Sequence, residues 1–323
     1  MESEEKRKWL FILGIIILIL SIIFTKDYRA ERVLQKHLKA RYGEEFVIFG
    51  MGKRAGNVRR WYEAAVIYPK SYIGTRKEND SYYWGKGFVD LNNGMKGGDT
   101  YGGVLLNESA NKFYGKKLKE LFGENYLAVL DVGGYYESID FEEEMKKRKK
   151  SYDESPNGVF PPISGGIYIF GRVENDEDRE WYRKQIYEFI QFMKETGTFE
   201  YVALDFNIAD ERIISKEFEE IHLKTELIQL YEEALSNKIK GEIFIEKRKN
   251  ILDKVGKNYI VDFSELEKWN KGEIVNLKNK LGMAGTINLC KILSEKYIKA
   301  NKHFYKEYEL KFYNNINDVK IEG

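Results

Sequence analysis

The sequence contains few residues whose types and spacing suit catalysis or metal binding. Its three histidines, His37, His222 and His303, lie far apart, and none stands in the paired pattern of a zinc-binding helix. The one cysteine, Cys290, has no histidine near it in the sequence, which favours a buried structural thiol over a nucleophile. We therefore expect no metal site and no cofactor.

Carboxylates are the remaining candidates for chemistry, because a hydrolase needs only two of them. Asp205 lies on a predicted strand, and Asp210 and Glu211 follow its end. With 52 acidic residues in the chain, such a grouping is expected by chance. The sequence favours a protein without enzymatic activity and assigns no catalytic residue. A hydrolase of the cell envelope with unidentified carboxylates stays open as an alternative.

Aromatic residues are abundant, with 23 Tyr, 19 Phe and 5 Trp, and several gather in polar surroundings. Tyrosine and tryptophan offer rigid contact area with one polar end, which suits the recognition of a protein or a sugar. Packing in the core is the competing explanation. The candidate binding residues are Trp61, Tyr62, Tyr82, Tyr83, Trp84, Tyr135 and Tyr136.

The overall composition limits the class of protein. The chain of 323 residues carries 53 Lys and Arg against 52 Asp and Glu, a formal charge of +1. A dedicated nucleic-acid binder normally has a strong basic excess, so no nucleic-acid partner is expected. The hydrophobic content of 43% is enough to build cores, which excludes a wholly disordered chain.

A long apolar run near the N-terminus predicts a membrane segment. Residues Trp9 to Phe24 are sixteen positions without a charge. As a helix they would measure roughly 24 Å, against a hydrocarbon core of about 30 Å. No cleavage site follows, which favours an uncleaved signal-anchor over a removable signal peptide. We expect a tail at residues 1–8 and a transmembrane helix at residues 9–25 in contact with the lipid bilayer.

The orientation of such a single-pass protein follows less directly. Three Lys and Arg precede the apolar run and six follow it closely, which by simple counting places the C-terminal part in the cytoplasm. Long domains, however, are translocated largely regardless of charge. We expect a single-pass protein of the cell membrane, with a cytoplasmic N-terminal tail and the bulk of the chain outside the cytoplasm. A scaffold that faces the cytoplasm stays open.

The rest of the chain predicts two small α+β modules with mainly antiparallel sheets. Residues 26–140 would form the first module, with a helix at 26–42, strands at 45–51, 60–68 and 81–91, a further helix at 111–122 and a strand from 126. Residues 141–164, with a run of charges and most of the prolines, read as a linker. Residues 165–323 would form the second module.

The second module begins with a clear strand, helix and strand. Asn175 or Asp176 is the expected cap of the helix, and apolar residues recur along one of its faces. The next strand alternates strictly, which predicts Val202, Leu204, Phe206 and Ile208 on the buried face. Another helix is expected from about residue 285.

Two stretches resemble known proteins. The segment YGEEFVIFG after an amphipathic helix resembles the start of small, uncharacterised membrane-anchored envelope proteins of low-GC bacteria. The stretch DREWYRKQIYEFIQFMKETGTFEYV resembles segments of similar proteins. The resemblance implies an anchor followed by an antiparallel sheet, and some proteins of this build act as immunity proteins against toxins. It carries over no functional residue.

Together these observations predict a membrane-anchored, extracytoplasmic binding protein without enzymatic activity. An immunity protein and an envelope-associated protein both fit this description. The expected partner is a protein whose identity the sequence does not give.

Overall fold

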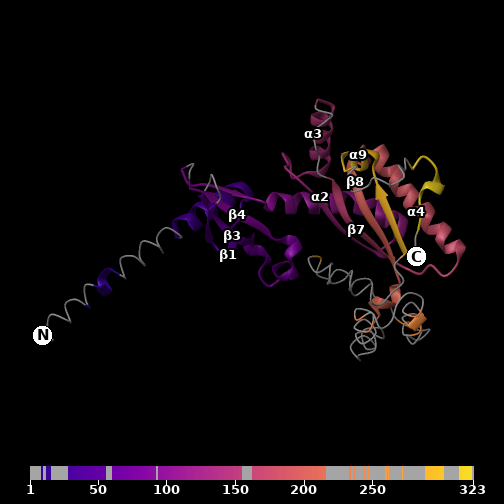
Figure 1. Ribbon diagram of the computed structural model, residues 1–323, viewed down its shortest axis with the longest axis horizontal. Coiled ribbons are helices and arrows are strands. Elements are labelled where there is room, and N and C mark those ends of the chain that lie inside the picture. Colours follow the sequence, from indigo (N-terminus) through magenta and orange to yellow (C-terminus); the bar gives the residue numbers. More distant parts are fainter. Residues whose placement is uncertain are drawn as a thin grey trace. The chain divides into compact units, whose positions relative to one another are not determined.

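The computed structural model describes residues 28–55, 60–91, 94–154, 162–215, 288–301 and 313–321, with isolated residues elsewhere. The chain divides into an N-terminal unit, Met1–Val104, and a C-terminal unit, Leu105–Gly323. Each unit contains one sheet with helices beside it (Figure 1). The α+β class with mainly antiparallel strands is therefore confirmed.

The expected transmembrane helix is corrected by the structure. No helix among the described residues is both long and apolar enough to cross a membrane. This finding contradicts the single-pass signal-anchor placed at residues 9–25. A spanning helix needs about 20 consecutive apolar residues, and the uncharged run has only sixteen. Of that run the structure describes Trp9 and residues 12–15, and the expected tail at 1–8 lies outside the described residues.

The N-terminal unit is built on a five-stranded antiparallel sheet in the order β1-β3-β4-β5, with β2 also paired to β3. The strands expected at 45–51, 60–68 and 81–91 are confirmed with altered bounds, and β2 and β5 were not foreseen. The bounds are β1 Phe46–Phe49, β2 Gly52–Ala55, β3 Arg60–Pro69, β4 Gly85–Asp90 and β5 Lys96–Asp99.

A helix over residues 28–42 covers one face of this sheet. Its Ala30, Leu34 and Leu38 are fully buried. The helix comes so close to β4 that a Cβ atom added to Gly87 would lie 2.5 Å from Leu34 Cδ2. A side chain at that position would force Leu34 to move, so glycine allows this close packing of the helix on the sheet.

Asp99, at the end of β5, ties the helix to the sheet through four neighbours. His37 Nε2 lies 2.8 Å from its Oδ2, and Arg41 Nη1 donates to the same oxygen at 3.1 Å. The other oxygen accepts from the Tyr42 hydroxyl at 2.6 Å and from the Tyr101 backbone N–H at 2.9 Å. Burial raises the pKa of Asp99, but these bonds outweigh it and hold the pKa below its usual value.

The C-terminal unit has a four-stranded sheet in the order β6-β7-β8-β9. The expected strand, helix and strand are confirmed as β7, α4 and β8. The sequence did not predict the direction of the strands: β7 and β8 are parallel, while the outer pairs are antiparallel. The Asn175 side chain caps α4 by accepting from the Asp178 backbone N–H at 2.8 Å. The bounds are β6 Tyr126–Val132, β7 Ile163–Phe170, α4 Asp176–Glu195, β8 Val202–Ala209 and β9 Asn288–Leu293.

The core of the C-terminal unit lies between one face of its sheet and the helices α2 (Tyr101–Phe122), α3 (Phe141–Glu154) and α4. α2 supplies Tyr114 and α4 supplies Phe189, whose ring centroids lie 5.5 Å apart. The alternating residues of β8 point into this core as expected. They are Val202, Leu204, Phe206 and Ile208.

The boundary between the units differs from the expected one. It falls inside α2, and the segment 141–164 contains α3 and the start of β7 instead of a plain linker. One side of α3 is buried, with Phe141, Glu144 and Arg148 turned inward, and the other side carries exposed charges. The charge run that suggested a linker is thus the exposed side of a packed helix.

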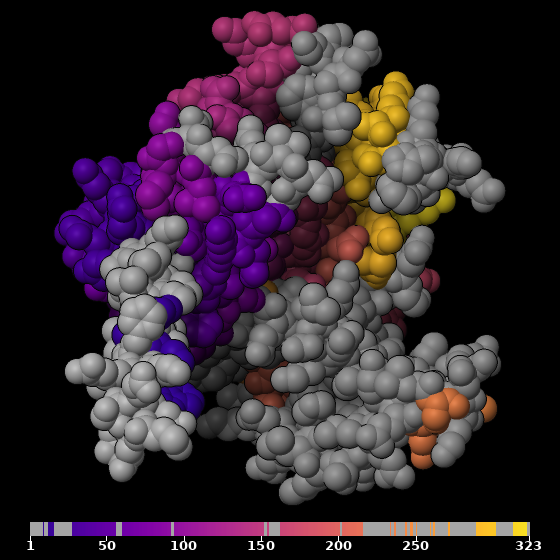
Figure 2. Space-filling view, turned by 60° about the vertical axis from the view of Figure 1, so that its left-hand side comes forward, coloured from indigo at the N-terminus to yellow at the C-terminus, as the bar shows by residue number. Residues whose placement is uncertain are grey.

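A C-terminal segment, residues 313–321, covers the edge of β9. The Tyr313 hydroxyl donates to Lys291 O at 3.1 Å and accepts from the Leu293 backbone N–H at 3.4 Å. The yellow residues of this segment and of β9 lie side by side in Figures 1 and 2. The helix expected from about residue 285 is wrong over 288–293, where β9 carries the buried Cys290.

We predict that Asp99→Asn destabilises the N-terminal unit by about 2–3 kcal/mol at neutral pH, because it weakens the bonds that join the helix to β5. Because the pKa of Asp99 is lowered by folding, its stabilisation is present above the ordinary value of 3.8 and is lost as the pH falls through the folded value.

Urea unfolding followed by tryptophan fluorescence measures this effect. The difference between the native chain and the variant should be largest near neutral pH and should shrink at about pH 3. A difference that stays constant down to that pH would show that the charge of Asp99 contributes nothing.

Candidate binding face

The two faces of the N-terminal sheet have opposite characters. On β4, Gly85, Gly87 and Val89 are buried beneath the helix, whereas Lys86 and Phe88 between them are exposed. In most antiparallel sheets with one solvated face, the outward side chains are polar. On this sheet many of the outward side chains are aromatic or aliphatic.

The register of the strands shows which residues share the outward face. Glu63 of β3 is paired with Phe88, so both lie on it. A bulge between Ala64 and Ile67 then shifts the alternation of β3 by one residue, and the residues that follow pair with β1. We call this surface the open face; its apolar members are Val47, Phe49, Trp61, Val66, Tyr68, Trp84 and Phe88.

None of these seven side chains is buried. Phe49 is 69% exposed and Phe88 is 40% exposed, and the other five are partly exposed. Phe46, three residues before Phe49 on the same strand, faces the helix and is only 2% exposed. The contrast within one short strand shows that the helix covers a single face of the sheet.

Hydrogen bonds and stacking hold the larger rings of the open face in place. The Trp61 indole N–H donates to Glu63 Oε2 at 3.1 Å, and that of Trp84 donates to Glu78 O at 3.1 Å. The Tyr68 and Trp84 rings stack with centroids 6.2 Å apart. Their apolar surfaces are thus presented with both indole N–H groups bonded, at little cost in side-chain entropy.

The structure separates the aromatic residues singled out in the sequence. Trp61 and Trp84 lie on the open face, whereas Tyr62 and Tyr83 are buried in the core. Tyr82 packs edge-on against Tyr83 at 5.2 Å between centroids. Sequence reasoning missed Phe49, Tyr68 and Phe88. The signal for Phe88 was its alternation with the glycines of β4, which marks the opposite side as the covered one.

The last two candidates, Tyr135 and Tyr136, lie in the C-terminal unit. Tyr135 is 87% exposed, and Tyr136 is partly buried against the core. Their loop is held by a buried ion pair between Glu144 and Arg148, with a distance of 2.8 Å, and Arg148 donates to Gly133 O at 2.9 Å. Tyr135 and Tyr136 therefore do not belong to the sheet that carries the open face.

The carboxylates considered for hydrolysis are engaged in local structure. Asp210 is buried, and Arg212 donates to both of its oxygens at 2.6–3.1 Å. Glu211 accepts from Arg172 Nε at 2.9 Å. Among the described residues, no group of three or more His, Cys, Asp or Glu is placed to hold a metal ion.

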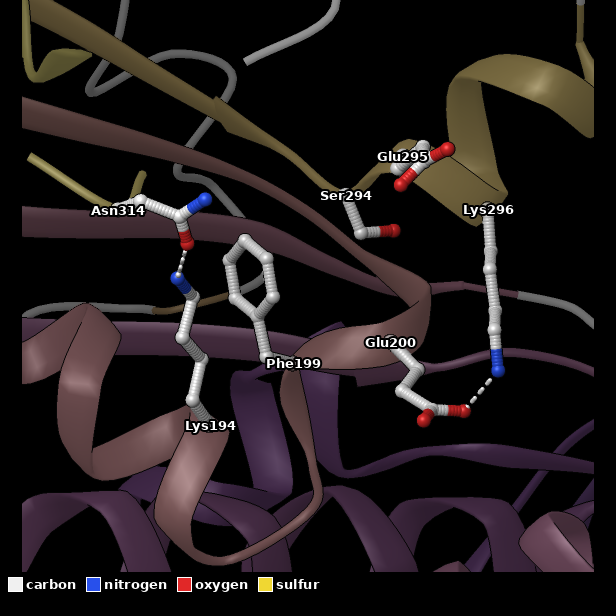
Figure 3. Close-up of a pocket in the computed structure, with 7 residues that line it drawn as sticks. All are labelled: Lys194, Phe199, Glu200, Ser294, Glu295, Lys296 and Asn314. Carbon is white, nitrogen blue, oxygen red and sulfur yellow. Dashed lines mark hydrogen bonds and ion pairs between the residues drawn. The ribbon is translucent and has the colours of Figure 1, made fainter. Parts of the chain in front are cut away.

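A cavity of about 260 Å³ lies in the C-terminal unit beside the start of α9 (Glu295–Ala300). Figure 3 shows its two lysines bonded to neighbours: Lys194 donates to Asn314 Oδ1 at 3.3 Å, and Lys296 forms an ion pair with Glu200. Because both cations are engaged with protein groups, we assign no binding role to this hollow and place the candidate site on the open face.

Comparisons with known proteins add little to this description. No family model matches the chain, and no curated protein matches it. A crystal structure of a DUF5037 family protein from Ruminococcus gnavus is similar, with a TM-score of 0.36 and 14% identity over 84% of this chain and 98% of that one. A likeness at this level carries no argument about function. The resemblance to envelope proteins stays a prediction.

We predict that truncating two phenylalanines of β1 changes the free energy of unfolding by very different amounts. Phe46→Ala removes a buried ring and should lower the free energy of unfolding by about 3–5 kcal/mol. Phe49→Ala removes an exposed ring and should change it by no more than about 0.5 kcal/mol. Denaturant unfolding of the two variants and the native chain measures both changes in the free energy of unfolding. Equal losses would mean that both faces of the sheet are covered.

Proposed function

We propose that the chain is a binding protein without enzymatic activity and that it holds a protein partner on the open face. The observation that carries the proposal is the one-sided burial of the N-terminal sheet. Its helix face is closed, while its other face keeps seven apolar side chains in contact with water. Contiguous apolar surface of this kind marks interaction sites on soluble domains.

The energy available from this surface supports a specific complex. Complete burial of one Phe side chain is worth about 1.5–3 kcal/mol, and Phe49 and Phe88 both start from an exposed state. Further apolar area, on side chains that are already fixed in place, comes from Trp61, Tyr68 and Trp84. Because these rings lie on paired strands, a partner would order few side chains on binding.

The chemistry of the open face supports binding over catalysis. Its central residues are the aromatic and aliphatic side chains, and among these Tyr68 has a titratable group. Partial burial together with the nearby Glu78 raises the pKa of the Tyr68 phenol. A phenol that stays protonated at neutral pH is a poor general base. The roles implied by the resemblance, immunity to a toxin and envelope assembly, both require a protein partner.

Partner capture with matched variants tests the proposal. The bait proteins are the native chain, the double variant Phe49→Ser with Phe88→Ser, and the control Ile73→Ser, which removes an exposed apolar side chain of the same unit away from the strands. We expect the native chain and the control to retain the same protein from a lysate of the source cells, and the double variant to lose it.

Titration of that purified protein should then show an affinity at least about 30-fold lower for the double variant, as truncation of central aromatic contacts typically gives. Circular dichroism should show that both variants are folded. Equal retention of the partner by all three baits would contradict a docking role for the open face.

A further inference from the structure

Three cations are interspersed among the aromatic side chains of the open face. Arg54 of β2 is paired with Trp61, and Lys96 of β5 is paired with Asp90, which places both side chains on this face. Lys86 lies two residues before Phe88 on β4 and shares its orientation. All three side chains are exposed. Among the described residues, no carboxylate forms a salt bridge with any of them.

The charge of the whole N-terminal unit has the same sign. Residues 1–104 contain 18 Lys and Arg against 12 Asp and Glu, a net charge of +6. Residues 105–323 contain 35 Lys and Arg against 40 Asp and Glu, a net charge of −5. The near-neutral total therefore conceals a basic unit that carries the open face. Such a field attracts acidic partners and speeds their association.

We infer that the partner presents an acidic segment with apolar side chains to the open face. Its carboxylates meet Arg54, Lys86 and Lys96, while its apolar groups cover Phe49 and Phe88. This inference rests on the proposed function and adds the chemistry of the partner to it.

An acidic protein segment suits the surface better than a nucleic acid, although single strands also bind to aromatic and basic surfaces. Neutralising a strand of phosphates takes a row of cations, whereas the cations on this face are separated by rings. A segment with alternating apolar and acidic residues matches that spacing.

Fluorescence anisotropy with defined peptides tests the inference on the full chain. The probe is a labelled peptide of about a dozen residues in which Glu alternates with Leu. The matched peptides replace every Glu by Gln or by Lys, and a labelled oligothymidine of similar length represents single-stranded DNA. Titrations at about 50 and 300 mM salt span the range over which exposed charges become screened.

We expect the Glu peptide to bind at least about 10-fold more tightly than the Gln peptide at low salt, and the Lys peptide not to bind. Arg54→Glu should weaken binding of the Glu peptide about 10-fold or more. The control Arg76→Glu changes the net charge equally at an exposed position outside the strands and should leave binding nearly unchanged.

The other outcomes are distinguishable from one another. If the Gln and Glu peptides bind equally and both depend on Phe49 and Phe88, the open face docks apolar segments and only the acidic inference is wrong. Tighter binding of the oligothymidine, lost in Arg54→Glu, would make the partner a nucleic acid and overturn it. Association of the chain with itself, lost in Arg54→Glu, would make the occupant a second copy and overturn it too. Failure of every peptide to bind also overturns the inference, while partner capture still decides the proposed function.

Discussion

The N-terminal unit depends on the close approach of one helix to one face of its sheet. A Cβ atom on Gly87 would lie 2.5 Å from Leu34 Cδ2, and one on Gly97 would lie 2.7 Å from the Cβ of His37. Glycine at both positions allows the helix to pack closely on the strands, and the hydrogen bonds to Asp99 hold it in this position. Because side chains alternate along a strand, Lys86 and Phe88, the neighbours of Gly87 on β4 that lie between its buried residues, must point the other way.

This alternation explains where the proposed binding surface lies. β4 and β5 place glycines against the helix, whereas the open face carries large apolar residues. A sheet that needed only to fold would carry polar side chains there, since water solvates them without cost. The bulge in β3 keeps Tyr68 on the same side as Trp61, so the apolar surface extends across the bulge. In our proposal, folding and binding use opposite faces of the same five strands.

Local patterns foretold part of this fold. The strict alternation of β8 and the capped, amphipathic α4 were predicted because both signals lie within a few neighbouring residues. The start of α2 at Tyr101 was missed by ten residues, because Gly102 and Gly103 are poor helix formers. The short apolar segment of β9 was mistaken for a helix, since a run of that length does not distinguish the two. The uncharged run at the N-terminus suggested a membrane span, and the structure contradicts that expectation.

The candidate site was foretold less well for a physical reason. Trp61 and Trp84 were found by their residue type, but the face to which each points depends on strand pairing over long distances in the sequence. Phe49 joins the open face only through its pairing with Val66, and Phe88 through its pairing with Glu63. A shift of one residue in either register would exchange the two faces. The exposed Tyr135 was also singled out as an aromatic residue in polar surroundings, but it belongs to the C-terminal unit.

Hydroxyl-radical footprinting of the full chain, read out by mass spectrometry, tests the central claim most directly. The account predicts rapid oxidation of Phe49 and Phe88 and strong protection of Phe46 and Tyr62, which lie on the same sheet beneath the helix. Equal protection of Phe49 and Phe46 would show that both faces are covered and would contradict the account.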